Sequence, residues 1–172
     1  MNDEKFYFFD MDGTLVEYRR DADVDKMKQQ GYFYNLKPEW NMILAMKRLH
    51  EIFPNRVYVL TAVYPDEFSF SVDEKYRYMK KIFPFMENNY ITVDVPMGET
   101  KQDKVLSLIG RSIDKNCLLI DDYSVNLKSW EESGGRPVKY KNGINNNNNT
   151  PHKYSVNCYM DPETVAATLL KF

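Results

Sequence analysis

Short apolar runs alternate with longer amphipathic stretches along most of this chain. Apolar runs bounded by glycine, proline and polar residues predict buried strands. Such runs begin at Phe6, span Arg56–Ala62 and Tyr90–Pro96, begin again at Cys117, and span Pro137–Lys141. The pattern therefore predicts five strands, separated by segments long enough to form helices.

The stretches between these runs repeat apolar residues at helical spacing, and proline and glycine mark their limits. In the stretch that Pro65 begins, for example, Tyr76, Met79, Lys80 and Phe83 recur at this spacing. The predicted helices span 38–53, the stretch that begins at 65, 101–110, 125–133, and 162 to the C-terminus.

Strands and helices thus alternate almost throughout the chain. This order implies right-handed crossovers and a parallel sheet with helices on both faces. We predict an α/β fold, a three-layer sandwich around a mostly parallel, Rossmann-like sheet, in a single domain over residues 1–172.

Two segments depart from this alternation. Glu17–Gln30 is rich in charge and predicts an exposed segment or a small lid, in which Arg19 and Arg20 either meet an anionic ligand or are simply solvated. The low-complexity run Asn145–Asn149 has no side chains whose burial would offset the entropy of ordering, so it predicts a mobile surface loop.

Composition narrows the class of protein. Of the 172 residues, 43% are hydrophobic and 28% are charged, which is typical of a soluble globular protein. A net charge of -2 argues against a nucleic-acid partner. No apolar run approaches the ~20 residues that span a bilayer, and the N-terminal MNDEKFYFF is acidic and too short for a signal peptide. We therefore expect no membrane partner and a cytoplasmic location.

Paired acids follow two of the predicted strands. Asp10 and Asp12 end the first strand, and both can face one pocket if the extended geometry persists through Met11. Asp121 and Asp122 end the strand that begins at Cys117. Like charges this close repel each other and raise one pKa, unless a cation neutralises them. Because oxygen ligands favour a hard divalent ion, we predict a Mg2+ site.

Other polar residues lie at the same edge of the predicted sheet. Thr61 ends the second strand, and ligands of parallel sheets bind beyond the carboxyl ends of the strands, so Asp10, Thr61 and Asp121 are predicted to share one site. Gly13 lets the backbone turn away and leaves amides close to a bound anion. Asn126 either hydrogen-bonds the loop that carries the acids or has no part in the chemistry.

In this order the motifs resemble those of the haloacid dehalogenase-like (HAD) superfamily of phosphohydrolases. FFDMDGTLV resembles the first motif, a strand followed by Asp-x-Asp-Gly-Thr/Val, and VYVLTA resembles the second, a strand ending in Thr or Ser. LLIDDYSVN resembles the fourth, an acid pair after an apolar strand. The third motif is a lysine near the start of the preceding helix. Lys101 and Lys104 both fit this place, and we choose Lys101.

The resemblance implies a HAD-like core and a Mg2+-dependent phosphomonoesterase that works through an aspartyl-phosphate. Asp10 would be the nucleophile, and Asp12 would be the general acid and base. Mg2+ would be held by Asp10, the backbone carbonyl of Asp12 and Asp121, and Asp122 would bind the ion through a water or orient its neighbour. The residues that would bind the phosphate are Thr61, Lys101 and Gly13.

A second resemblance concerns the substrate. GYFYNLKPEWNMILAMKRL, and LIDDYSVNLKSWEESGG followed by KYKNGIN, resemble segments of small bacterial and phage proteins of the 5'(3')-deoxyribonucleotidase-like branch. This implies a 5'-nucleotidase whose minimal cap, residues 17–37, determines the substrate together with residues 64–70.

Two alternatives to the nucleotidase function stay open. One is a phosphatase for a sugar phosphate or another small metabolite, and the other is a catalytically silent binding or regulatory module. The aromatic residues near the predicted cap either stack on a base or pack in the core. They are Tyr18, Tyr32, Phe33 and Tyr34.

Overall fold

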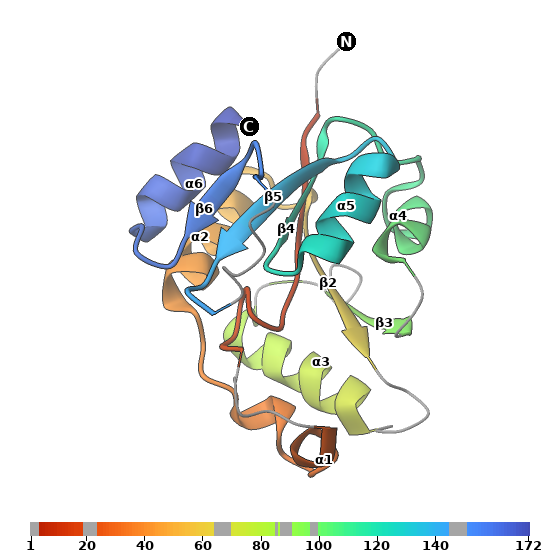
Figure 1. Cartoon of the computed structure of the whole chain (residues 1–172), viewed down its shortest axis with the longest axis vertical. Helices are drawn as coiled ribbons and strands as arrows, with labels where there is room; N and C mark the ends of the chain where they lie inside the picture. Colours follow the sequence, from red (N-terminus) through yellow and green to blue (C-terminus); the bar gives the residue numbers. More distant parts are fainter. Residues whose placement is uncertain are drawn as a thin grey trace.

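The computed structural model describes residues 4–18, 24–63, 70–84, 86, 91–96, 100–144 and 151–172. In these residues a six-stranded parallel sheet, in the order β3-β2-β1-β4-β5-β6, forms the middle of the molecule, and helices cover both of its faces (Figure 1). The predicted three-layer α/β fold is therefore confirmed. None of the described helices is long and apolar enough to cross a membrane.

The elements follow the predicted order. The strands are β1 (Phe6–Phe9), β2 (Val57–Val63), β3 (Ile91–Pro96), β4 (Cys117–Asp121), β5 (Arg136–Lys141) and β6 (Ser155–Asn157). The helices are α1 (Val24–Met27), the 3-10 helix η1 (Phe33–Asn35), α2 (Trp40–Ile52), α3 (Phe70–Ile82), α4 (Lys101–Ile109), α5 (Ser124–Glu132) and α6 (Pro162–Lys171). Predictions that concern Arg19, Arg20, 64–69 and Asn145–Asn149 lie outside the described residues.

Side chains of the central strands alternate between two cores. In β1, Tyr7 and Phe9 join the core formed with α2, α3 and α6, whereas Phe6 and Phe8 join the core under α4 and α5. The strands β2 and β4 divide their apolar residues between the same two cores. Because both faces are buried, the apolar runs in the sequence are continuous rather than alternating.

The sixth strand was missed by the sequence analysis. β6 is a three-residue edge strand that pairs with Lys139–Lys141 of β5, and Val156 is its one buried side chain. A single apolar residue gives no periodicity, so the sequence could not distinguish this strand from a loop. Figure 1 shows α3 and α1 on the side to which the arrowhead of β2 points, which is the edge that carries the polar residues described next.

Candidate active site

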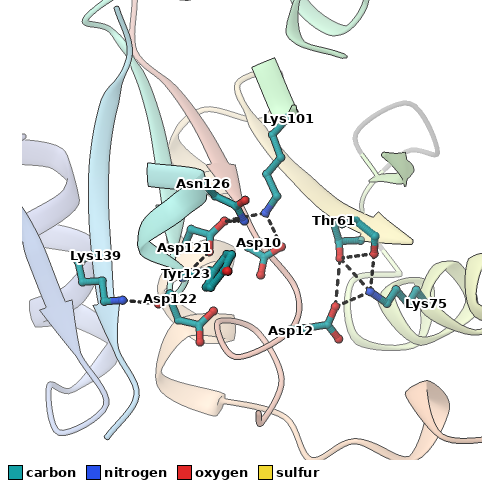
Figure 2. A network of polar contacts seen from close by, with 11 residues as sticks. Asp10, Asp12, Thr61, Lys75, Lys101, Asp121, Asp122, Tyr123, Asn126 and Lys139 are labelled. Atoms are coloured by element: carbon teal, nitrogen blue, oxygen red, sulfur yellow. Dashed lines mark hydrogen bonds and ion pairs between the residues drawn. The ribbon is translucent and has the colours of Figure 1, made fainter. Parts of the chain in front are cut away.

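Asp10, Asp121 and Asp122 form a buried cluster at the carboxyl ends of β1 and β4 (Figure 2). One carboxylate oxygen from each residue lies within 4.8 Å of the others. The two strands are neighbours with Phe9 opposite Ile120, so the acids that follow these residues emerge at the same level of the sheet. Three converging carboxylates are a donor set that fits a hard divalent cation such as Mg2+.

The Lys101 side chain reaches this cluster from the first turn of α4 (Figure 2). Its ammonium group donates to Asp10 Oδ1 at 2.5 Å and to Asp121 Oδ2 at 2.7 Å. Burial alone would lower the pKa of Lys101, but the two carboxylates raise it, so the lysine stays charged. Of the two candidate lysines, Lys101 therefore supplies the cation at these acids, and two of its three N–H donors are used by them.

Replacing Lys101 with methionine should strongly destabilise the metal-free protein, because Asp10 and Asp121 would lose their shared buried cation. We expect the free energy of unfolding, measured by urea titration with a chelator, to fall by ~3 kcal/mol or more. Added Mg2+ should recover part of this loss. The matched change Lys104→Met, one turn along the same helix, should cost no more than ~0.5 kcal/mol. Equal losses in the two variants would contradict the assignment of Lys101.

Asp12 turns away from the acid cluster and pairs with a different lysine. Lys75 of α3 is almost fully buried, and its ammonium group donates to Asp12 Oδ2. The same group donates to the carbonyl oxygen of Ala62 at 2.6 Å and to Thr61 Oγ1 at 3.3 Å (Figure 2). The two acids of the first motif are thus neutralised separately, one by each lysine.

The backbone at Asp10–Asp12 is not the extended strand on which the sequence analysis relied. β1 ends at Phe9, and the chain enters a turn in which Gly13 has φ +78°. The Gly13 N–H donates to the carbonyl oxygen of Val16 at 2.8 Å, so this amide has a partner within the turn. A Cβ atom at Gly13 would lie 2.3 Å from Asp122 Oδ2, and this close approach explains the glycine.

Two asparagines hold the acidic loops in place. Asn126 Nδ2 donates to Asp121 Oδ2 at 2.9 Å, which favours the first of the two roles considered for this residue. Asn142 Nδ2 donates to the carbonyl oxygen of Gly13 at 3.0 Å and to Asp122 Oδ2 at 2.8 Å. The second asparagine therefore ties the turn after β1 to the loop after β4.

A cavity of about 360 Å3 lies beside these residues. The charged and amide side chains that line it are those of Asp10, Asp12, Glu17, Lys75, Asp122 and Asn126. The lining also includes four aromatic residues, which we call the aromatic wall: Tyr18, Tyr32, Phe33 and Tyr123. Three of these four residues come from the predicted cap and its edge. Tyr34, the other aromatic residue named from the sequence, instead packs edge-on against Tyr78.

Lys75 and Lys139 are site residues that sequence reasoning missed. The Lys139 ammonium group is buried and donates to the backbone carbonyl of Asp122 (Figure 2). Lys75 had a detectable signal, since it lies three and four residues before Tyr78 and Met79, on the buried stripe of α3. A lysine on such a stripe needs a buried partner, and that requirement points to a site.

Comparisons with known proteins agree with this fold. No protein-family model matches the sequence, and a search of curated proteins finds no match. Among solved structures, D,D-heptose 1,7-bisphosphate phosphatase from Burkholderia thailandensis is similar, with TM-score 0.64 and 13% identity over 98% of this chain and 100% of that one. The corresponding phosphatase from B. bronchiseptica, solved with magnesium and phosphate, gives TM-score 0.66 and 15% identity over 97% and 98%.

A haloacid dehalogenase-like hydrolase from Streptococcus pneumoniae is also similar, with TM-score 0.61 and 16% identity over 98% of this chain and 100% of that one. At these identities the likeness establishes the fold. The chain therefore has the fold of HAD-superfamily hydrolases over nearly its whole length.

Proposed function

We propose that this chain is a HAD-superfamily phosphohydrolase, a Mg2+-dependent phosphomonoesterase that works through an aspartyl-phosphate on Asp10. The observation that carries the proposal is the separation of the two acids of the first motif. Asp10 lies in a buried carboxylate cluster that fits a divalent cation, whereas Asp12 faces the same cavity outside the cluster, beside Lys75. A nucleophile and a proton-transfer group need such different surroundings.

The acid cluster supplies the oxygen ligands that Mg2+ requires. Asp10, Asp121 and the backbone carbonyl of Asp12 would hold the ion, with Asp122 in the same cluster. Bound there, Mg2+ would screen the repulsion between these carboxylates and the phosphate and would polarise the phosphoryl oxygens.

The reaction divides into two displacements at phosphorus. A carboxylate oxygen of Asp10 attacks the phosphorus atom and the bond to the leaving oxygen breaks, while Asp12 donates a proton to that oxygen. A water molecule then attacks the aspartyl-phosphate and gives its proton to Asp12, which releases phosphate and regenerates Asp10. The Lys75 ammonium and the Thr61 hydroxyl would bind phosphoryl oxygens as charge shifts in the transition state.

This assignment moves the phosphate-binding role from Lys101 to Lys75. Lys101 already donates to Asp10 and Asp121, and it does not line the cavity, whereas Lys75 does. In the proposal, Lys101 favours the ionised form of the nucleophile and orients its carboxylate. Gly13 contributes through its close packing against Asp122 rather than through its amide.

The aromatic wall favours a substrate with a flat leaving group, such as a (deoxy)nucleoside 5'-monophosphate. Rings of this kind bind flat groups by stacking. A sugar phosphate is the second candidate, because two of the similar structures are heptose bisphosphate phosphatases.

Phosphate release from a panel of deoxynucleotides, ribonucleotides and sugar phosphates tests the proposal. Each ester is assayed with Mg2+ and with a chelator. We expect release that depends on Mg2+ and is greatest for the nucleotides. Release concentrated on sugar phosphates would keep the chemistry and change the substrate. The absence of release from every ester would favour the binding-module alternative.

A further inference from the structure

Glu74 is a buried acid next to Lys75 whose partners are backbone amides of the predicted cap. Its Oε1 accepts the Gly31 N–H at 2.5 Å, and its Oε2 accepts the Phe33 N–H at 3.1 Å. Only 5% of Glu74 is exposed. Both oxygens of one carboxylate therefore hold a short stretch of backbone that is far away in the sequence.

A second contact holds the other end of this stretch. Tyr78 lies one turn after Glu74 on the same side of α3, and its hydroxyl donates to the carbonyl oxygen of Leu36 at 2.6 Å. Burial raises the pKa of Tyr78 to about 12, so the hydroxyl remains a donor at ordinary pH. The segment 31–36 is thus attached to α3 at both ends.

The held segment carries half of the aromatic wall. Tyr32 and Phe33 both line the cavity. The Lys75 ammonium lies 4.8 Å from the centre of the Phe33 ring, so this ring covers the lysine that contacts Asp12. Consecutive residues of one helical turn therefore serve the same cavity: Lys75 lines it, and Glu74 holds the backbone of two aromatic residues that line it.

We propose that Glu74 is a positioning residue that fixes the leaving-group side of the cavity by clamping the Gly31–Phe33 backbone to α3. The inference rests on the proposed function, because it assumes that an ester occupies this cavity. Without the clamp, Tyr32 and Phe33 would lose their fixed place beside Lys75. Binding of a flat leaving group would then weaken more than binding of a small, flexible one.

The test compares Glu74→Gln with Asp73→Asn, the same carboxylate-to-amide change at an exposed neighbour in α3. In Glu74→Gln one of the two backbone amides faces an NH2 group instead of an oxygen. We expect amide hydrogen exchange at Gly31 and Phe33 to accelerate about tenfold or more, as expected for loss of a hydrogen bond to a charged group. Asp73→Asn should leave both rates unchanged.

Ligand binding provides the second readout. Dissociation constants for phenyl phosphate and glycerol 3-phosphate are measured in an Asp10→Asn background, because this variant is expected to leave the bound esters intact. We expect Glu74→Gln to weaken phenyl phosphate about tenfold and glycerol 3-phosphate less than about twofold. Glu74→Asp, which keeps the charge on a shorter side chain, replaces Glu74→Gln in both readouts if the latter does not fold.

Unchanged exchange at Gly31 and Phe33, an equal loss of affinity for the two esters, or the same effects in Asp73→Asn would each overturn the inference. Phosphate release by the wild-type protein is measured separately. Selective loss of phenyl phosphate binding without any wild-type turnover would support the clamp and reject the proposed chemistry, so the two failures are distinguishable.

Discussion

Replacing Asp10 with asparagine should abolish phosphate release while the protein remains folded. An amide is a poor nucleophile and a neutral metal ligand, so we expect kcat to fall by ~10^4-fold or more. The backbone at this position is held independently of the side chain, because the Asp10 N–H donates to the carbonyl oxygen of Ile120 at 2.9 Å. Phosphate release measures the loss, and circular dichroism monitors the fold. Activity retained in this variant would reject the covalent mechanism.

The same variant should change how the stability of the metal-free protein depends on pH. Burial raises the pKa of Asp10 well above 3.8, and Asp121, Asp12 and Asp122 raise it further, although Lys101 opposes them. The folded state therefore holds this proton more tightly than the unfolded chain does. The resulting stability is present below pH 3.8 and is lost as the pH rises through the raised pKa.

An amide side chain at this position cannot titrate, so Asp10→Asn should lack this loss. Urea titrations with a chelator, at pH values from below 3.8 upward through the raised pKa of Asp10, compare the free energy of unfolding of the variant with that of the wild-type protein. Asp73→Asn is the control, because this exposed acid lies far from the cluster in the sequence and pairs with an exposed arginine on its own helix, α3. Parallel pH profiles for wild type and Asp10→Asn would contradict the raised pKa.

The acids at the carboxyl ends of β1 and β4 could be predicted because both strands are buried on two faces. Double-sided burial makes the apolar runs continuous, and the acids that follow interrupt them sharply. Adjacent parallel strands end at one edge of the sheet, so the topology alone brings Asp10 and Asp121 together. The register of Phe9 opposite Ile120 shows this meeting directly.

The partners of these acids depend on how the helices dock, and this docking could not be predicted from the sequence. Lys101 begins a helix, as predicted, but the packing of α4 puts its ammonium between two acids rather than in the cavity. Lys75 and Glu74 lie on a helix that the spacing of its apolar residues predicts, but this spacing does not show where the helix packs in the fold. Only the docking of α3 against β3 and η1 shows that Lys75 contacts Asp12 and that Glu74 holds the Gly31 amide.

This arrangement gives the four acids, and the two lysines that contact their carboxylates, distinct places in the site. Lys101 balances part of the charge where a divalent cation would bind, so the cluster of Asp10, Asp121 and Asp122 keeps an excess of negative charge. Lys75 balances the negative charge of Asp12, the acid that would transfer protons. Among the described residues that line the cavity, Lys75 supplies the buried cation, and in the proposed mechanism its ammonium would meet an incoming phosphate.

Replacing Lys75 with methionine should therefore weaken both phosphate binding and turnover. Methionine fills a similar volume but removes the ammonium group that contacts Asp12, Thr61 and Ala62. Loss of one preorganised donor to a developing charge lowers kcat by ~10^2- to 10^3-fold, and we expect a fall in kcat/KM of at least this size. Initial rates with Mg2+ measure it, and inhibition by inorganic phosphate reports binding separately.

Lys81→Met is the matched control, because Lys81 lies on the exposed side of the same helix. It should leave kcat/KM and phosphate inhibition within about twofold of the wild-type values, since surface substitutions rarely change free energies by more than ~0.5 kcal/mol. If Lys75→Met lowers turnover but leaves phosphate inhibition unchanged, the ammonium acts only through Asp12. The phosphate-binding role would then return to Lys101, whose ammonium group has a third N–H besides the two that it donates to Asp10 and Asp121.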